Sequence, residues 1–95
     1  MPSAVPNLEW QATAIADLLA IEDYISDHNP DAAQTLKDKI EEKTSQLPEH
    51  PKMHRLGRVD GTREMIIHPN YIVVYAETPD IVRILRLLHA AQHWP

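Results

Sequence analysis

The side chains whose chemistry is easiest to specify are three cationic groups in the second half of the chain, Arg63, Arg86 and His89. An arginine holds a phosphate or a carboxylate through paired hydrogen bonds, and a histidine beside an arginine can act as a general acid or base. Arg63 and Arg86 would form a phosphate-holding pair if the register of their strands brought them together. These three residues are therefore the candidate catalytic groups.

An ordinary structural role is the alternative for each of these groups. The arginines could form surface ion pairs, and His89 could be held by hydrogen bonds without taking part in a reaction. Arg83 and Arg86 have opposite parity in one predicted strand, so they are expected on opposite faces, and at most one shares a face with Arg63. The acidic residues available for such pairs are Glu64, Glu77 and Asp80.

Metal and nucleophile sites find little support in the sequence. His50 and His54, like His89 and His93, are four residues apart, a spacing that can bind a metal on a helix. Pro51 disfavours a helix at the first pair, and the second pair begins where a strand ends. The chain also lacks cysteine, a glycine-rich phosphate loop and a serine in a glycine-flanked turn. We therefore expect no metal and no cofactor.

The charge of the chain is unevenly distributed. Residues 1–48 hold three lysines and nine acidic residues, whereas residues 49–95 hold six lysines or arginines and five acidic residues. The net charge of −5 argues against non-specific binding to nucleic acid, which depends on many phosphate contacts. No apolar stretch is long enough to cross a membrane, and residues 1–6 do not resemble a secretory signal. We expect a cytoplasmic protein without a membrane partner.

The elements that must position these groups begin with a short strand and two helices, within a single domain of residues 1–95. Asn7–Trp10 alternates as a strand does. A first helix is predicted from about Ala12 to about Asp27, and a second begins at Pro30, capped by Asn29. The short link predicts an antiparallel hairpin. Its apolar stripes are Ala14, Leu18, Ile21 and Ile25, widened by Ile15 and Leu19, and Ala33, Leu36, Ile40, Thr44 and Leu47.

The second half predicts an antiparallel meander after a loop over residues 49–58 and a turn at Asp60-Gly61. The strands are expected at about Arg63–His68, Tyr71–Glu77 and Ile81–His89. Because the middle strand is apolar on both faces, it is expected at the centre of the sheet. The fold class is therefore α+β, with three to four antiparallel strands. The helical hairpin covers one face of the sheet, and the other face is left apolar and open to a partner.

Several sequence strings together resemble the RelE/ParE toxin superfamily, over about Leu8 to Trp94. The resemblance is closer to the ParE branch. It rests on the order of elements and on the strings Gly61-Thr62-Arg63-Glu64, His68-Pro69-Asn70-Tyr71-Ile72-Val73-Val74-Tyr75, Ile84-Leu85-Arg86-Leu87-Leu88-His89-Ala90-Ala91-Gln92, Asn29-Pro30-Asp31-Ala32-Ala33 and Leu47-Pro48-Glu49-His50-Pro51.

The resemblance implies the toxin half of a type II toxin–antitoxin pair, neutralised by a co-encoded antitoxin and able to form higher-order assemblies with it. The residues predicted to bind the antitoxin are Leu18, Ile25, Leu36, Tyr71, Tyr75 and Trp94. Because the first half is acidic, we expect the antitoxin to bring arginine or lysine to the helical hairpin.

The cellular target implied by the resemblance is either DNA gyrase, which ParE-like toxins poison, or mRNA in the ribosomal A site, which RelE-like toxins cut. In the ribonuclease, Arg63 matches the phosphate-holding arginine of the family, and Arg86 and His89 match further cationic positions. The chain is acidic, has only Lys52 as a lysine in its second half and has no tyrosine after Tyr75, unlike RelE-like nucleases. A gyrase-binding toxin is therefore favoured, with the ribonuclease as the alternative and a non-toxic binding module as a third possibility.

Overall fold

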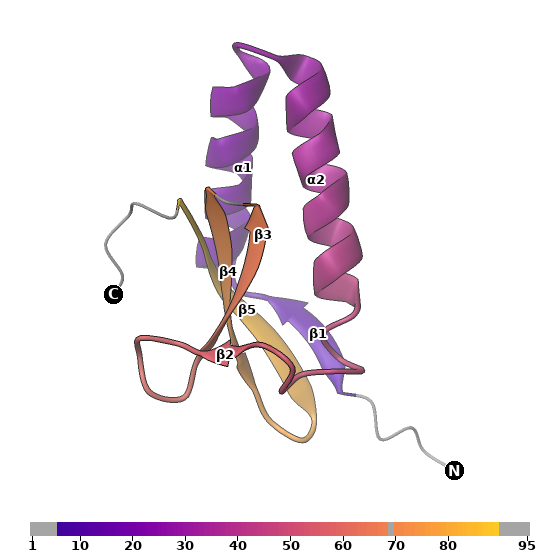
Figure 1. Ribbon diagram of the computed structural model, residues 1–95, viewed down its shortest axis with the longest axis vertical. Helices are drawn as coiled ribbons and strands as arrows, with labels where there is room; N and C mark the ends of the chain where they lie inside the picture. The colour runs from indigo at the N-terminus through magenta and orange to yellow at the C-terminus, as the bar shows by residue number, and fades with distance from the viewer. Residues whose placement is uncertain (1–5, 69, 90–95) are drawn as a thin grey trace.

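The computed structural model describes residues 6–68 and 70–89. A helical hairpin stands beside a five-stranded sheet of order β1-β5-β4-β3-β2 (Figure 1). The elements are β1 (Asn7–Trp10), α1 (Ala12–Ser26), α2 (Pro30–Ser45), β2 (Arg55–Leu56), β3 (Arg63–His68), β4 (Tyr71–Glu77) and β5 (Ile81–His89). The α+β class, the two helices and the three long strands are confirmed. Neither helix in the described ranges is long and apolar enough to cross a membrane.

The helical hairpin forms where the sequence predicts it. The Asn29 side chain accepts a hydrogen bond of 3.1 Å from the Ala32 amide, and Pro30 occupies the first turn of α2. This cap satisfies one of the amides that a helix start leaves without a partner. The two helices run antiparallel and extend beyond the ends of β3 and β4 (Figure 1).

The sheet is mixed rather than wholly antiparallel. Strands β3, β4 and β5 form the predicted meander, with β4 at the centre, but β1 pairs in parallel with β5. The amides of Asn7 and Gln11 donate to the carbonyls of Asp80 and Ile84, at 2.9 Å each. These bonds extend the β1–β5 pairing to the start of α1, which follows directly. Two-residue β2 was missed because it lies in a stretch without strand periodicity, which was predicted as loop.

A β-bulge in β5 changes which arginines share a face. Along β4, Val74 pairs with Arg86 and Ala76 pairs with Arg83, so the extra residue is Leu85. Val74 and Ala76 point to the same face of the sheet, and their partners therefore do too. The expectation that Arg83 and Arg86 lie on opposite faces was wrong, because simple alternation does not hold across a bulge.

The main core lies between the helices and one face of the sheet. Ala14, Leu36 and Ile40 of the hairpin pack there with the strand residues Met65, Ile67, Val73, Tyr75, Val82, Ile84 and Leu87. The other face holds a smaller cluster of Ile72, Val74 and Leu88, with Leu85 packed against it. These three are at most 5% exposed, so the expected open apolar face is largely buried. Ile66 remains 51% exposed on that face.

Two predicted core residues of α1 are exposed instead. Ile15 is 45% and Leu19 55% exposed, whereas Ala14, Leu18, Ile21 and Ile25 belong to or pack against the core. The apolar stripe that contacts the sheet is therefore narrower than the sequence suggests. A flanking side of α1 runs along β5, where Thr13 donates to the Leu85 carbonyl at 2.9 Å. This contact satisfies a strand-edge group beyond the end of β1.

Candidate functional site

A groove opens between the tip of the helical hairpin and the start of β4. Its volume is about 440 Å3, and we call it the hairpin groove. It is lined by Ile25 of α1, by Ala32, Thr35, Leu36 and Lys39 of α2, and by Asn70 and Tyr71 at the β3–β4 turn. The lining is mainly apolar, and among the described residues that form it Lys39 is the one charged side chain. A concave apolar surface of this kind suits an apolar side chain of a partner.

The hairpin groove gathers half of the residues predicted to bind an antitoxin. Ile25, Leu36 and Tyr71 line it together. Leu18 packs against the main core and is half-buried, and Tyr75 is fully buried, so Tyr75 has no surface to offer a partner. Trp94 lies outside the described residues.

Arg63 is held beneath the loop that precedes β2. Its guanidinium donates to the carbonyl of His54 at 2.8 Å and to that of Lys52 at 3.4 Å. Its Nε lies 3.9 Å from the carboxylate of Glu77, and both side chains are about one-fifth exposed. These contacts fasten the loop to the sheet, and they occupy donors that a phosphate would need.

Tyr75 and His54 strengthen the same attachment. The Tyr75 hydroxyl donates to the Pro51 carbonyl at 2.7 Å, and the two rings meet edge-on with centroids 6.3 Å apart. Burial raises the pKa of the Tyr75 phenol, although the charge of Arg63 opposes the shift. Burial also lowers the pKa of His54, helped by the charge of Lys43. The Tyr75 hydroxyl and ring therefore attach residues 51–54 to β4.

Arg86 forms a two-point ion pair with Asp17 of α1. Its Nε and one terminal nitrogen lie 2.7 and 3.1 Å from the two carboxylate oxygens. Asp17 also accepts the Leu87 amide at 3.0 Å, so this carboxylate joins α1 to the β5 edge. The hydrogen bond to Asp17 raises the pKa of Arg86. The expected partners of this arginine were Glu64, Glu77 and Asp80 at the surface. Its partner is instead Asp17 of α1, and the pair is partly buried.

The three candidate catalytic groups do not converge. Arg63 pairs with Tyr75 and Arg86 pairs with Val74, and neighbouring residues of β4 point to opposite faces. His89 pairs with Tyr71, whereas Arg63 pairs with Tyr75, four residues further along β4. That spacing separates His89 from Arg63 by roughly 13 Å along the strand direction. The His89 ring meets that of Tyr71 edge-on at 5.5 Å. The predicted phosphate-holding pair of Arg63 and Arg86 is therefore not formed.

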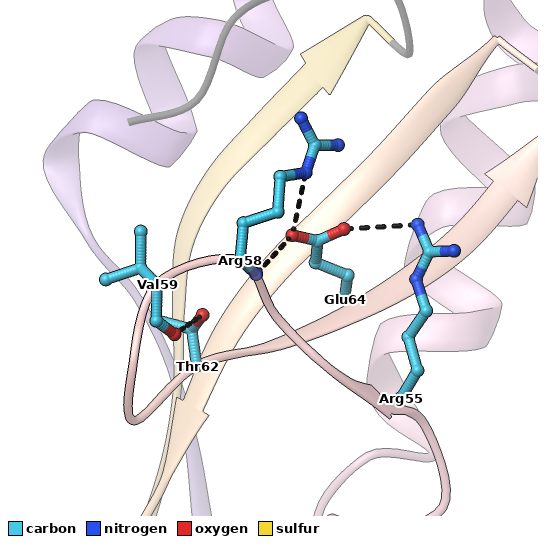
Figure 2. Close-up of polar contacts among 5 residues, drawn as sticks. All are labelled: Arg55, Arg58, Val59, Thr62 and Glu64. Carbon is cyan, nitrogen blue, oxygen red and sulfur yellow. Dashed lines mark hydrogen bonds and ion pairs between the residues drawn. The ribbon is translucent and has the colours of Figure 1, made fainter.

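A cluster that was not predicted from the sequence lies on the sheet face away from the helices. Glu64 of β3, only 2% exposed, is held by Arg55 of β2 and by Arg58 of the following loop (Figure 2). We call these three residues the Glu64 cluster. An acidic residue inside an apolar strand, with two arginines shortly before it, was the available signal. Among the residues that the structure describes, no group of three His, Asp or Glu side chains could hold a metal ion.

Known proteins resemble this chain over nearly its whole length. The family model for the ParE toxin of the type II toxin–antitoxin system parDE matches residues 8–94. Toxin RelE2 of Caulobacter vibrioides is 36% identical over 83 residues, which cover 87% of this chain and 93% of that protein. The putative toxin Y4kP of Sinorhizobium fredii is 36% identical over 90 residues, which cover 94% of this chain and 93% of that protein.

Solved structures share the fold. A chain of the chromosomal ParDE toxin–antitoxin system from P. aeruginosa superposes with a TM-score of 0.82 at 24% identity, covering 92% of this chain and 98% of that one. YafQ from E. coli superposes with a TM-score of 0.69 at 15% identity, covering 90% of this chain and 94% of that one.

Proposed function

Because the chain belongs to the ParE toxin family of type II toxin–antitoxin systems, we propose that it arrests growth by binding DNA gyrase and not by cutting RNA. A co-encoded antitoxin neutralises it by occupying the hairpin groove. Toxin, antitoxin and target then meet in the cytoplasm. Binding of this kind needs neither a cofactor nor a catalytic group.

The separation of the cationic groups is the observation that supports a binding mechanism. Cutting RNA through the ribose hydroxyl requires a general base, a general acid and cationic groups around a single phosphate. Here Arg63 and Arg86 lie on opposite faces, and each is engaged by acceptors of its own chain. Moving the Arg63 side chain onto a phosphate would break the hydrogen bonds that attach the loop before β2 to the sheet. Moving Arg86 would break those that attach α1.

The charge of the helical hairpin supports a basic antitoxin contact. Residues 12–45 carry eight acidic residues and three lysines. Ile25, Leu36 and Tyr71 give the hairpin groove an apolar lining, and the acidic excess belongs to the helical hairpin as a whole. An antitoxin segment with an apolar anchor and neighbouring arginine or lysine residues would complement both features.

A ribosome-dependent ribonuclease is the second candidate. The observation in its favour is the 36% identity to a toxin named RelE2. His89 is exposed at the end of β5, where a substrate could reach it. In that case His89 would serve as the acid or base. Arg86 points to the opposite face of β5 and would not stand beside it.

Two assays on the purified protein separate the candidates. We expect inhibition of gyrase supercoiling, and we expect no cleavage of mRNA on programmed ribosomes. His89→Ala should leave growth arrest unchanged, because the side chain is exposed and its loss should not disturb the fold. Ribosome-dependent cleavage that falls at least about tenfold in His89→Ala would instead establish the ribonuclease. Harmless expression without antitoxin, and no effect in either assay, would identify a non-toxic binding module.

A further inference from the structure

The Glu64 cluster combines one buried carboxylate with two partly exposed guanidinium groups. Arg55 lies 3.1 Å from one carboxylate oxygen, and the Nε of Arg58 lies 3.3 Å from the other (Figure 2). The Arg58 amide donates to that second oxygen at 3.0 Å. The side chains of Arg55 and Arg58 are 55% and 44% exposed. The carboxylate is thus fully engaged, while the arginines still face solvent.

Both arginines keep donors for a further acceptor. A guanidinium has five N–H donors. Arg55 uses one in a hydrogen bond to Glu64, and Arg58 faces the same carboxylate through Nε in an ion pair. Arg58 is bound through Nε, so its two terminal nitrogens project beyond the carboxylate (Figure 2). No other acceptor for either side chain occurs within the described ranges 6–68 and 70–89. The pair carries two positive charges against one negative charge.

The loop that carries Arg58 is built to hold it in place. The Gly57 amide donates to the Thr62 carbonyl at 2.8 Å. The Thr62 hydroxyl donates to the Val59 carbonyl at 2.6 Å (Figure 2). Gly61 has a φ of 82°, a left-handed conformation that favours glycine. A side chain at Gly57 would collide with the Thr62 hydroxyl. Fixing Arg58 in advance lowers the entropy that a ligand would have to offset.

The surroundings favour a protein ligand over a nucleic acid. Ile66 lies on the same face as Glu64, two residues along β3, and is 51% exposed. An apolar neighbour suits a peptide side chain, whereas nucleic-acid affinity is a sum over many phosphate contacts. Two arginines on a chain of net charge −5 cannot supply that sum.

We propose that Arg55 and Arg58 bind an aspartate or glutamate side chain of the antitoxin, with an adjacent apolar residue of that segment packing on Ile66. This inference rests on the proposed toxin–antitoxin function. It adds a second contact, on the sheet face opposite the helices, to the one in the hairpin groove. The two contacts differ in charge, so the antitoxin segment that reaches Arg55 and Arg58 is acidic, whereas the segment at the hairpin is basic.

Calorimetric titration of the purified toxin with its co-encoded antitoxin tests this contact. Arg55→Gln and Arg58→Gln should each weaken binding about tenfold, the usual scale for one charge-assisted hydrogen bond. Arg83→Gln is the matched control, because Arg83 is 49% exposed and pairs only with Glu9 in the described chain. It should change the affinity by less than about twofold.

A triple variant keeps the test valid if an unpaired Glu64 disturbs folding. Arg55→Gln, Arg58→Gln and Glu64→Gln together remove all three charges, so no buried carboxylate is left alone. We expect this variant to melt as one cooperative unit, to bind the antitoxin more weakly than either single variant, and to lose part of the salt dependence of binding.

Each contrary result has a distinct meaning. Unchanged affinity in both single variants and in the triple variant would overturn this inference and leave the proposed function intact. Loss of binding to a single-stranded RNA oligonucleotide, with antitoxin affinity unchanged, would overturn it in favour of a phosphate ligand. Failure of the unmodified protein to bind the antitoxin would overturn both the inference and the proposed function.

Discussion

The hairpin groove and the Glu64 cluster are two surfaces of opposite chemical character on one small molecule. The groove is apolar and lies on an acidic helical hairpin, whereas the cluster is cationic and lies on the far face of the sheet. Apolar area contributes free energy without much direction, and paired charges contribute orientation and partner choice. A partner that satisfies both must reach around the sheet, which places demands on its length as well as on its sequence.

The two regions also differ in what holds them together. The groove depends on the packing and capping of two helices, while the cluster depends on one carboxylate. Substitutions that affect only one region therefore test whether the two are independent.

The largest effect is expected from Glu64→Gln. Burial alone would raise the pKa of the Glu64 carboxyl, but the Arg58 amide and the charges of Arg58 and Arg55 outweigh it, so the pKa is lowered. Removing the charge should lower the free energy of unfolding by about 2 kcal/mol, less than for a fully buried pair because the arginines are half exposed. Chemical denaturation measures this loss.

The pH dependence of the same variant is its internal check. A lowered folded-state pKa contributes stability above the ordinary value of 4.5, and that contribution is lost as the pH falls through the folded-state value. The Glu64→Gln protein should lack this pH-dependent contribution to the free energy of unfolding. Glu9→Gln, at an exposed ion pair with Arg83, should cost less than about 0.5 kcal/mol. An equal cost at both positions would contradict the special role of Glu64.

A bulky residue in the hairpin groove should weaken antitoxin binding without affecting the cluster. Ala32 is exposed and lines the groove, so Ala32→Trp should fill the space that an antitoxin side chain would occupy. We expect affinity to fall about tenfold, or roughly 1.4 kcal/mol. Glu42→Trp, exposed on the same helix, controls for the added ring, and unchanged affinity in Ala32→Trp would remove the groove from the binding surface.

Asn29→Ala should loosen the hairpin tip. It removes the bond to the Ala32 amide, and such caps contribute about 1 kcal/mol. Thermal unfolding should show this loss, whereas Glu41→Ala at an exposed interior position of α2 should change stability by less than about 0.5 kcal/mol. If the Glu64 cluster is independent, the added cost of Glu64→Gln in the Asn29→Ala background will match its cost alone.

The smallest effect is the titration of His54. Burial lowers the pKa of His54 below the ordinary value of 6.5. The free energy of unfolding is therefore highest above pH 6.5, with respect to this group, and declines as the pH falls below it. His54→Gln should flatten this part of the stability curve. A stability that rises on acidification through this range would mean that the ring is better held when protonated.

The sequence by itself determined the local elements. Period-3.6 apolar residues, the Asn29-Pro30 start of α2 and the glycine turn at Gly61 predicted both helices and the turn before β3, because these signals depend on neighbouring residues alone. The alternating runs from Arg63 to His89 likewise predicted the three long strands and the central place of β4.

Only the tertiary structure decided which side chains meet. The bulge at Leu85 turned Arg86 to the face of Glu64, and pairing with α1 gave it Asp17 as a partner. The two-residue β2 brought Arg55 opposite Glu64, although no periodic pattern marked that strand. Register shifts and long-range pairings depend on how distant segments fit together. Arg86 could therefore be recognised from the sequence as a candidate, but neither its partner nor its face could, and the role of Arg55 became visible only in the fold.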